Sequence, residues 1–344
     1  MLVLLRPGSP PQEFDRLIED LEEAGLRISL TEDSSRTLLS IEEVPERLEG
    51  LALEGYSCVE RVLCLARPYR LAARETHPEG SCVKAGPACF GDGSLTVIAG
   101  PCAVEDEATL LDTARAAKRA GAQLLRGGAY KPRTSPYDFQ GLGEPGLEML
   151  RDVASETGLG IVTEALDPRD LDKVAAIADM IQLGSRNMQN YALLKAAAET
   201  GKPVMLKRGR ACTVTEWLCA AEYLLAGGNS EVVLCERGLV SHDSAVRNLL
   251  DLSCVPLVRR LSHLPVVVDP SHATGRSELV PAMARAAVAA GADGVMIEVH
   301  SRPERARSDA RQALRPEELE TLVPELTAIH KILARSPHVA GRST

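Results

Sequence analysis

Four residues that lie far apart in the sequence could together bind a metal ion. Cys102, His272, Glu298 and Asp309 offer a thiolate, an imidazole and two carboxylates. This mixture of sulfur, nitrogen and oxygen suits Mn²⁺, Fe²⁺, Co²⁺ or Zn²⁺, and it suits Mg²⁺ or Ca²⁺ poorly. A single cysteine or histidine is more often a structural residue than a ligand. The prediction of a divalent metal site therefore depends on all four residues meeting in the fold.

Six cationic residues form a second group with its own chemistry. Arginine binds phosphate and carboxylate oxygens through paired hydrogen bonds, and lysine adds a point charge. The group predicts a site for polyanionic substrates, with more than one phosphate. The alternative, a solvated charge paired with an acid, is plausible for any one of them but poor for the group, because Arg126 and Lys207 end otherwise apolar segments. The six are Arg126, Lys131, Arg133, Arg186, Lys207 and Arg237.

Eight short apolar segments must position these residues. Each segment is typical of a buried parallel strand, and helix-like stretches separate most of them. Eight strands alternating with helices close a (β/α)8 TIM barrel, whose active sites lie at the C-terminal ends of the strands. Each segment carries a polar or charged residue at or near that end, as Glu164 does in the third. The segments are residues 95–99, 123–127, 160–165, 179–184, 203–208, 231–236, 265–270 and 294–299.

The first 65 residues predict a separate small unit. Predicted strands and helices alternate in the βαββαβ order of a ferredoxin-like domain. The strands are expected at 2–6, 26–31, 36–41 and 59–66, and the helices at 12–24 and 43–50. The whole chain then divides into a ferredoxin-like domain (1–66), a linker with a barrel-capping hairpin (67–93), the barrel (94–335) and a C-terminal tail (336–344). We expect Gly91-Asp92-Gly93 to form the turn of the hairpin.

Composition limits the possible partners and the compartment. The chain of 344 residues is long enough for a barrel and a small extra domain, and its net charge of −9 argues against nucleic acid or an anionic membrane as the main partner. The apolar N-terminal run is too short for a signal peptide, and no run is long enough to span a membrane. We therefore expect a cytoplasmic protein. Its nine cysteines include no C-x-x-C pair and are expected to be reduced.

The segment 125–136, LRGGAYKPRTSP, has the most unusual composition in the chain. Its two glycines let the backbone approach a ligand closely, and its prolines stiffen the rest of the loop. Lys131, Arg133, Thr134 and Ser135 offer two positive charges and two hydroxyl groups to one anion.

At this segment the chain resembles the 3-deoxy-D-arabino-heptulosonate 7-phosphate (DAHP) synthases, in the short type I class that carries an N-terminal ferredoxin-like regulatory domain. The resemblance spans nearly the full chain. It implies a transferase that condenses phosphoenolpyruvate with erythrose 4-phosphate and releases phosphate, in the first step of the shikimate pathway to aromatic amino acids. The matching stretches are 99–102, 125–143, 162–165, 182–187, 206–209, 235–238, 268–272, 297–300 and 308–309.

The resemblance also implies a role for each site residue. The metal ligands would be Cys102, His272, Glu298 and Asp309. The residues around phosphoenolpyruvate would be Arg126, Lys131, Glu164, Ser185, Arg186, Lys207 and Arg237. The aldose phosphate would meet Lys131, Pro132, Arg133 and Thr134, with Ser135 beside them. The reaction itself would depend on Lys131, Glu164, Arg126 and His272, with the metal polarising the aldehyde oxygen.

Regulation and assembly are further implications of the resemblance. Tyrosine or phenylalanine would be the effector of a homo-oligomer, a tetramer, and the candidate effector residues are Gly8, Ser29, Thr31 and Arg36. A passive oligomerisation module is the alternative for this N-terminal unit. The family usually continues Ile-Arg-Thr after Gly238, whereas this chain has Leu239-Val240-Ser241-His242-Asp243, a difference that could alter aldose binding.

Two other functions compete with this interpretation. The first is 3-deoxy-D-manno-octulosonate 8-phosphate synthase, which performs the same chemistry on a longer aldose. That family typically has Lys-Ala-Asn-Arg-Ser where this chain has Lys131-Pro132-Arg133-Thr134, and it lacks the N-terminal domain. The second is a catalytically silent sensor of aromatic amino acids, against which the intact ligands and cations argue.

Overall fold

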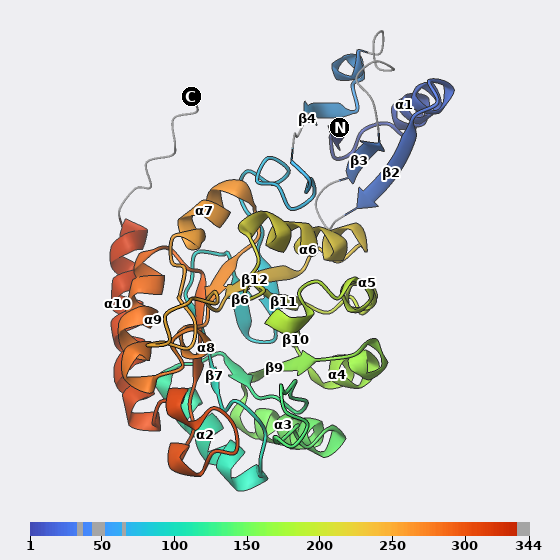
Figure 1. Ribbon diagram of the computed structural model, residues 1–344. Helices are drawn as coiled ribbons and strands as arrows, with labels where there is room; N and C mark the ends of the chain where they lie inside the picture. Colours follow the sequence, from blue (N-terminus) through green and yellow to red (C-terminus); the bar gives the residue numbers. More distant parts are fainter. Residues whose placement is uncertain (33–36, 43–51, 64–66, 336–344) are drawn as a thin grey trace.

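A closed barrel of eight parallel strands forms the centre of the molecule, in the order β10-β11-β12-β13-β14-β7-β8-β9 (Figure 1). The structure, a computed structural model, describes residues 1–32, 37–42, 52–63 and 67–335. All eight strands predicted from the sequence are present. They are β7 (Thr96–Gly100), β8 (Leu124–Arg126), β9 (Gly160–Ala165), β10 (Met180–Leu183), β11 (Val204–Lys207), β12 (Val232–Glu236), β13 (Val266–Val268) and β14 (Gly294–Glu298). Every residue of these strands is buried, which explains why their sequences are apolar without a polar face.

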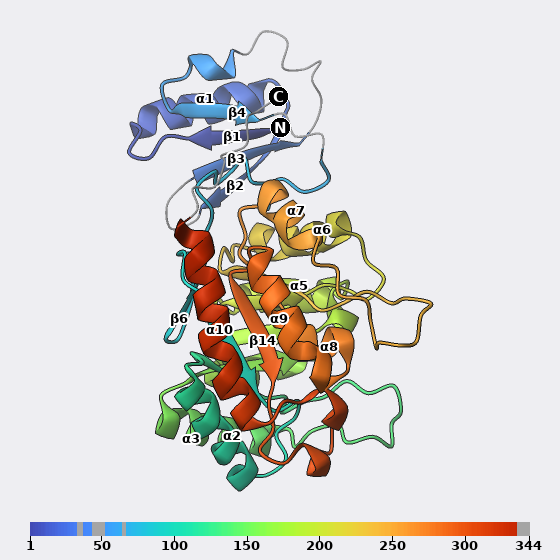
Figure 2. The same cartoon turned by 90° about the vertical axis from the view of Figure 1, so that its left-hand side faces the viewer.

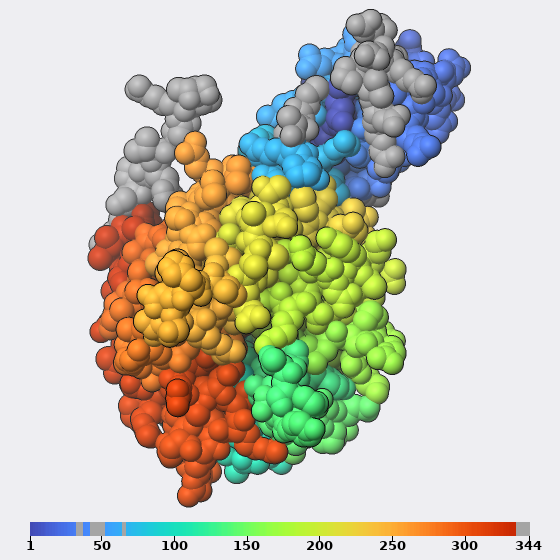
Figure 3. All heavy atoms as spheres, viewed as in Figure 1, coloured from blue at the N-terminus to red at the C-terminus, as the bar shows by residue number. Residues whose placement is uncertain are grey.

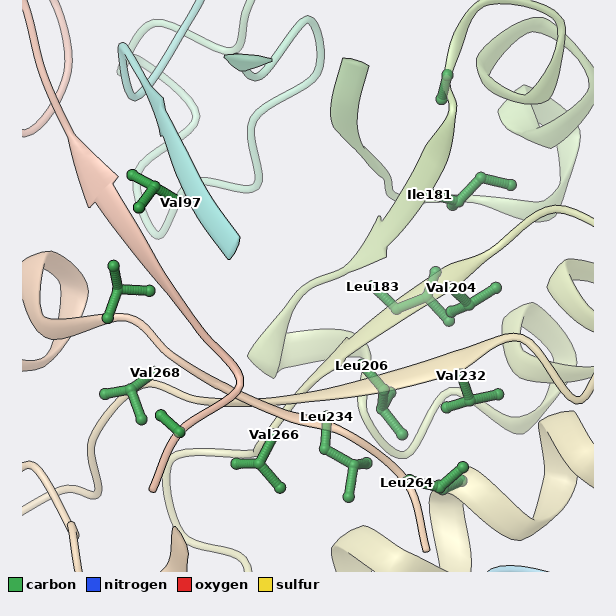
Figure 4. Packing of buried hydrophobic residues seen from close by; sticks show 14 of the residues in the cluster. Val97, Ile181, Leu183, Val204, Leu206, Val232, Leu234, Leu264, Val266 and Val268 are labelled. Atoms are coloured by element: carbon green, nitrogen blue, oxygen red, sulfur yellow. The ribbon is translucent and has the colours of Figure 1, made fainter. Parts of the chain in front are cut away.

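Helices surround the barrel and cover the outer faces of its strands (Figures 1 and 2). They are α2 (Glu107–Ala120), α3 (Glu144–Thr157), α4 (Leu171–Ile177), α5 (Tyr191–Glu199), α6 (Val214–Ala226), α7 (Cys254–Leu261), α8 (Pro270–Thr274), α9 (Val280–Ala289) and α10 (Pro316–Arg335). Outward strand residues such as Leu183, Leu206 and Val232 pack in the layer between strands and helices (Figure 4). Trp217 of α6 is fully buried there, and its Nε1 donates to the Leu206 carbonyl at 3.1 Å. Replacing Trp217 with alanine should cost about 3–5 kcal/mol of stability.

A hairpin closes the N-terminal end of the barrel. Its strands are β5 (Val83–Ala85) and β6 (Ala88–Phe90), and Val83 and Phe90 pack against the innermost apolar side chains of the barrel strands. The predicted cap is therefore present. The predicted turn is wrong, because Ala85 pairs with Ala88 and leaves Gly86-Pro87 as the turn, with Gly86 at a φ of 53°. In Figure 2, β6 lies on the side of the barrel opposite the long loops.

The same hairpin corrects the prediction for the cysteines. Cys82 and Cys89 form a disulfide, with their Cα atoms 6.6 Å apart. The antiparallel pairing of β5 and β6 brings the two residues together across the hairpin, whereas in the sequence they show no spacing motif. Among the described residues, Cys58, Cys102, Cys212, Cys219, Cys235 and Cys254 are free thiols, as predicted.

The N-terminal residues form a four-stranded antiparallel sheet in the order β2-β3-β1-β4. Its elements are β1 (Leu2–Leu5), α1 (Pro11–Glu23), β2 (Arg27–Glu32), β3 (Thr37–Glu42), a 3-10 turn (Leu53–Gly55) and β4 (Val59–Leu63). The four predicted strands and the first helix are confirmed. The predicted helix at 43–50 lies outside the described residues, so the complete ferredoxin-like unit and its boundaries remain a prediction.

The small sheet is attached to the side of the barrel beside α6 and α7 (Figures 1 and 3). One of its faces packs against Leu17 and Leu21 of α1, while Leu2 and Leu4 belong to the same core cluster as the barrel. Between the two, Glu222 of α6 accepts hydrogen bonds from the backbone N–H groups of residues 70–72, at 2.8–2.9 Å. No helix in the described part of the chain is long and apolar enough to cross a membrane.

Candidate active site

The pleat of the strands explains how polar groups enter the barrel. Side chains alternate between the inside and the outside of a strand, so the second residue after an inward apolar residue also points inward. In β8, β9 and β11 the apolar residues Leu124, Val162 and Met205 belong to the inner cluster. The following inward positions are taken by Arg126, Glu164 and Lys207, and in β10 and β14 by Gln182 and Glu298. The strands therefore deliver a layer of polar groups to the C-terminal end of the barrel.

The four predicted metal ligands meet at this end. Each offers one ligand atom, and these atoms all lie within 4.8 Å of one another. His272 Nε2 lies 3.1 Å from Glu298 Oε1 and 3.9 Å from Asp309 Oδ2, and Cys102 Sγ lies 3.1 Å from Asp309 Oδ2. Asp309 has a φ of 52°, and no other non-glycine residue in the described ranges has a positive φ. Such a costly backbone conformation is typical of functional sites.

Asp269 fixes the orientation of His272. This fully buried carboxylate accepts a hydrogen bond from His272 Nδ1 at 2.7 Å and another from the backbone N–H of His272 at 2.9 Å. Lys207 Nζ also donates to Asp269. Because Nδ1 is occupied, Nε2 is the nitrogen that faces Glu298 and Asp309. A carboxylate behind a histidine is the usual arrangement around a protein metal site.

The protonation of the cluster also fits a cation. Burial lowers the pKa of His272, so its imidazole is neutral at physiological pH and its Nε2 can donate an electron pair. Burial alone would raise the pKa of Glu298, but its interactions with His272 and with the Arg126 guanidinium lower it below the ordinary value. Burial, reinforced by Glu298, raises the pKa of the Cys102 thiol to about 12. A divalent ion would displace this thiol proton on binding.

A cavity of about 250 Å³ opens beside the cluster. Eight arginine and lysine side chains line it, against only three acidic residues, so the cavity is strongly cationic although the whole chain is acidic. The lining residues predicted from the sequence are Arg126, Lys131, Pro132, Arg133, Thr134, Glu164, Ser185, Arg186, Lys207, Arg237, His272 and Asp309. Cys102 and Glu298 do not line the cavity. Ser135 does not line it either, and its Oγ instead accepts from the Tyr137 N–H at 3.3 Å.

Three buried polar atoms around the cavity have no hydrogen-bond partner within the described part of the chain: Arg126 Nε, Ser185 Oγ and Arg237 Nη1. Buried polar groups are normally hydrogen-bonded, so donors left free at a cavity indicate a ligand with acceptor oxygens. Burial lowers the pKa of Arg237, and burial together with Arg210 and Arg247 lowers that of Arg186. This local excess of positive charge is what an anionic ligand would neutralise.

Two glycines make room for Glu164 and Lys131. A Cβ atom at Gly184 would lie 1.9 Å from Glu164 Oε1, and one at Gly128 would lie 2.4 Å from Lys131 Cδ. Any larger residue would displace the carboxylate or the lysine. The Gly-Gly pair that was predicted to bring backbone close to a ligand therefore also lets Lys131 fold back over its own loop.

Sequence reasoning missed several residues of the site. Asp138, Gln182, Arg210 and Arg247 line the cavity. Gln182 carried a usable signal, as a polar residue inside an apolar strand. Arg210 and Arg247 lie in loops, where no periodicity marks them. Ser241 and His242, in the segment where the family usually has Ile-Arg-Thr, are not among the lining residues.

A comparison with known protein families identifies the family of the chain that carries this site. The model of the DAHP synthetase I family matches residues 80–335. The chain belongs to the DAHP synthetase I family. It is therefore an enzyme, and the resemblance seen in the sequence is confirmed at the level of the family.

Individual DAHP synthetase relatives differ in how much of the chain they match. Phospho-2-dehydro-3-deoxyheptonate aldolase of Thermotoga maritima is 46% identical over 326 residues, which cover 95% of this chain and 96% of the relative. The crystal structure of the Thermotoga maritima DAHP synthase superposes with a TM-score of 0.77 at 45% identity, over 97% of this chain and 98% of that one. The 2-dehydro-3-deoxyphosphooctonate aldolase of Nitrobacter hamburgensis is 34% identical over 266 residues, covering 72% of this chain and 92% of the relative.

Proposed function

We propose that the enzyme condenses phosphoenolpyruvate with erythrose 4-phosphate to give DAHP and phosphate, the first step of the shikimate pathway. The observation that carries this proposal is a cavity lined by eight cations directly beside a cluster of four metal-ligand side chains. Two substrates that each bear a phosphate need such an excess of cations. Similarity to the Thermotoga maritima phospho-2-dehydro-3-deoxyheptonate aldolase over 95% of the chain supports the four-carbon aldose phosphate as the second substrate.

Each substrate has a proposed place in the cavity. Arg237 and Ser185 hold the phosphate and carboxylate of phosphoenolpyruvate, because Arg237 Nη1 and Ser185 Oγ need acceptor oxygens, and Arg186 adds a second guanidinium beside them. Arg126 and Lys207 complete that subsite from the inner layer of the barrel. The loop Lys131-Pro132-Arg133-Thr134, with Ser135 behind it, holds the aldose phosphate. Both substrates are thereby brought next to His272 and Asp309.

We further propose that Cys102, His272, Glu298 and Asp309 bind one divalent ion, Mn²⁺, Fe²⁺, Co²⁺ or Zn²⁺. The spacing of the four ligand atoms and the free Nε2 of a neutral His272 support this assignment. Bound there, the ion would supply Lewis acidity to the aldehyde oxygen of the aldose. Cys102 acts as a ligand and not as a nucleophile.

The protein side chains orient the reactants and move protons. C3 of phosphoenolpyruvate forms a bond to the aldehyde carbon, which leaves a cationic centre at C2. Glu164 holds a water molecule and takes one of its protons as the oxygen adds to C2. Lys131, whose charge acts on both Cys102 and Asp309, donates a proton on the metal side, where the former aldehyde oxygen becomes a hydroxyl. The C2 hydroxyl then gives its remaining proton to Lys131, and Glu164 passes the proton it took to the departing phosphate. The C2–O bond to phosphate breaks, hydrogen phosphate leaves, and the ketone of DAHP remains. Arg186 and Arg237 act by position and charge.

The proposal is tested by measuring phosphate release from phosphoenolpyruvate with erythrose 4-phosphate, with and without a chelator. We expect turnover that a chelator abolishes and added Mn²⁺ or Co²⁺ restores. Faster turnover with arabinose 5-phosphate would instead assign the octulosonate reaction, which the 34% identity to the Nitrobacter hamburgensis relative keeps as the second candidate. No turnover with either aldose would favour a silent sensor.

We also propose that the N-terminal sheet senses tyrosine or phenylalanine within a homotetramer. Gly8 lies in the turn after β1, with a φ of 75°, and Ser29 and Thr31 lie on the edge strand β2. An edge strand with hydroxyl side chains is accessible to an amino acid or to a second subunit, which supports this role. The fourth candidate, Arg36, lies outside the described residues.

A further inference from the structure

The two carboxylate ligands are each held at the oxygen that does not face the ligand cluster. Glu298 Oε1 and Asp309 Oδ2 lie toward His272 and Cys102. Glu298 Oε2 accepts a hydrogen bond from Gln312 Nε2 at 2.7 Å, and Asp309 Oδ1 lies 3.3 Å from Arg247 Nη1. Arg247 Nη1 also donates to Gln312 Oε1 at 2.9 Å. One connected pair, Arg247 and Gln312, therefore contacts both carboxylates from outside.

The geometry gives the amide of Gln312 a single useful orientation. Its oxygen faces a guanidinium and its NH₂ group faces a carboxylate, so rotating the amide by half a turn would make both contacts repulsive. Gln312 is 2% exposed and cannot exchange these partners for water. Its backbone is fixed as well, since Gln312 N–H donates to the Asp309 carbonyl at 3.1 Å and Leu314 N–H donates to the Glu298 carbonyl at 2.8 Å.

Arg247 is anchored to the element that carries His272. Its backbone N–H donates to the Thr274 carbonyl at 3.0 Å, and Asn248 Nδ2 donates to the His272 carbonyl at 3.0 Å. Gly275 leaves the space for this contact, because a Cβ atom there would lie 2.6 Å from Arg247 Cβ. The guanidinium of Arg247 is thus placed by α8 and lines the substrate cavity on its other side.

We propose that Arg247 and Gln312 are positioning residues that hold Asp309 and Glu298 in the orientation needed to bind the metal. Because Arg247 also lines the substrate cavity, it connects these carboxylates to the site of the anionic substrate. The inference rests on the metal site of the proposed function. Hydrogen-bond partners behind metal ligands typically change metal affinity by about 10–100-fold when they are removed. The effects of the two residues should be partly coupled, because Arg247 reaches Glu298 only through Gln312, although it also contacts Asp309 directly.

The test measures Co²⁺ binding to the full-length, metal-free enzyme without substrates, followed by the absorption band that a cysteine thiolate gives with Co²⁺. We expect Gln312→Met, which keeps the length of the side chain but not its hydrogen bonds, to weaken Co²⁺ binding by about 10–100-fold. Arg247→Gln should weaken it by at least about 10-fold. The double variant should lose less affinity than the product of the two single losses, since the two residues share the contact between Arg247 and Gln312.

Arg276→Gln is the matched control. Arg276 lies near Arg247 but forms its ion pair with Glu278, so Co²⁺ binding should stay within about twofold of the unmodified enzyme. Because Arg247 is 37% exposed, Arg247→Gln tests the inference even where Gln312→Met does not fold. Unchanged Co²⁺ affinity in Arg247→Gln, or additive losses in the double variant, would overturn the inference. An enzyme that binds Co²⁺ as expected but fails to condense its substrates would refute the proposed function alone.

Discussion

The buried carboxylate of Asp269 accepts a hydrogen bond from His272 Nδ1 at 2.7 Å, on the side of the ring away from Glu298 and Asp309. The same carboxylate also accepts a hydrogen bond from the ammonium group of Lys207, so His272 and Lys207 share it. Burial by itself would raise the pKa of Asp269, but His272 and Lys207 hold it well below its ordinary value. The carboxylate is therefore ionised at every pH at which the enzyme is expected to work.

Asp269→Asn should weaken metal binding and turnover more than it weakens the fold. An amide in this position no longer favours the tautomer with the proton on Nδ1, and it leaves the Lys207 charge without its partner. We expect metal affinity to fall by about 10–100-fold. Calorimetric titration of the metal-free variant with Mn²⁺ or Co²⁺ checks this. Asp92→Asn is the control, because Asp92 lies in an exposed turn and bonds Ser94. Equal metal affinity in both variants would contradict the assigned role of Asp269.

Cys102→Ser should abolish metal-dependent turnover and leave the fold intact. A neutral hydroxyl is a poor substitute for a thiolate ligand. Cys102 is buried, but serine has nearly the same size, so the substitution should change the packing little. Phosphate release in excess Mn²⁺ measures the loss. Cys219→Ser serves as the matched control, because Cys219 lies on α6 away from the cluster. Near-full activity of Cys102→Ser in excess metal would remove Cys102 from the ligand set.

The protonation state of the Cys102 thiol determines how we expect metal binding to depend on pH. Its pKa of about 12 in the metal-free enzyme means that Cys102 carries a proton throughout the neutral range. Each metal ion that binds must release this proton, so affinity should rise about tenfold for each unit of increasing pH. His272, whose pKa is lowered, adds a second released proton only in acid, where the dependence becomes steeper. Metal titrations at several pH values in two buffers of different ionisation enthalpy measure the number of protons. An affinity that does not change with pH would contradict a thiol-to-thiolate change on binding.

The loop 131–135 should set the preference between aldoses. Arg133 Nε donates to the Phe139 carbonyl at 2.8 Å, and its Nη2 donates to Ser308, which also contacts Cys102 at 3.0 Å. The loop is thus tied to the cluster of proposed metal ligands, and we expect its distance from them to limit the length of the aldose. The triple change Pro132→Ala, Arg133→Asn and Thr134→Arg should lower kcat/KM for erythrose 4-phosphate by at least about 10-fold and raise the relative rate with arabinose 5-phosphate. Faster turnover of arabinose 5-phosphate by the unmodified enzyme would contradict the proposed substrate.

The sequence predicted the barrel because its strands are buried on both faces and are therefore apolar along their whole length. The same reasoning marked Arg126, Lys207 and Glu298, since charged residues at the ends of buried strands have no structural use. Asp309 lies on no strand, so its residue type and the family resemblance were what indicated it. The sequence did not locate Arg247 or Gln312, because their contacts depend on how the loops after β12 and β14 meet. The prediction of the hairpin turn was wrong for a similar reason, because the turn depends on which residues of the two strands pair. Gly91 was available for a turn, but the pairing of β5 with β6 places it beyond the strands, where a Cβ atom would lie 2.1 Å from the Ser81 carbonyl oxygen.

Tyrosine or phenylalanine should inhibit the full-length enzyme. The four strands and first helix of the predicted regulatory unit are present, and the sheet is bound to the barrel through Arg70, which donates to Ser40 at 3.2 Å, and through Glu222 on α6. A ligand that changes the sheet can therefore act on the barrel through a continuous set of contacts. Coupling of about 1–3 kcal/mol is usual for such regulation, so saturating effector should inhibit several-fold or more.

Variants on β2 separate regulation by the sheet from direct competition at the active site. Ser29→Ala and Thr31→Val should reduce inhibition by tyrosine or phenylalanine and leave turnover without effector unchanged, because neither residue is near the cavity. Ser155→Ala, on the exposed face of α3, is the control and should be inhibited like the unmodified enzyme. Initial rates of phosphate release with each amino acid from micromolar to millimolar concentration measure all three. If the full-length enzyme ignores both amino acids at millimolar concentration, the sheet has no such regulatory role, and the passive oligomerisation module becomes the better account of it.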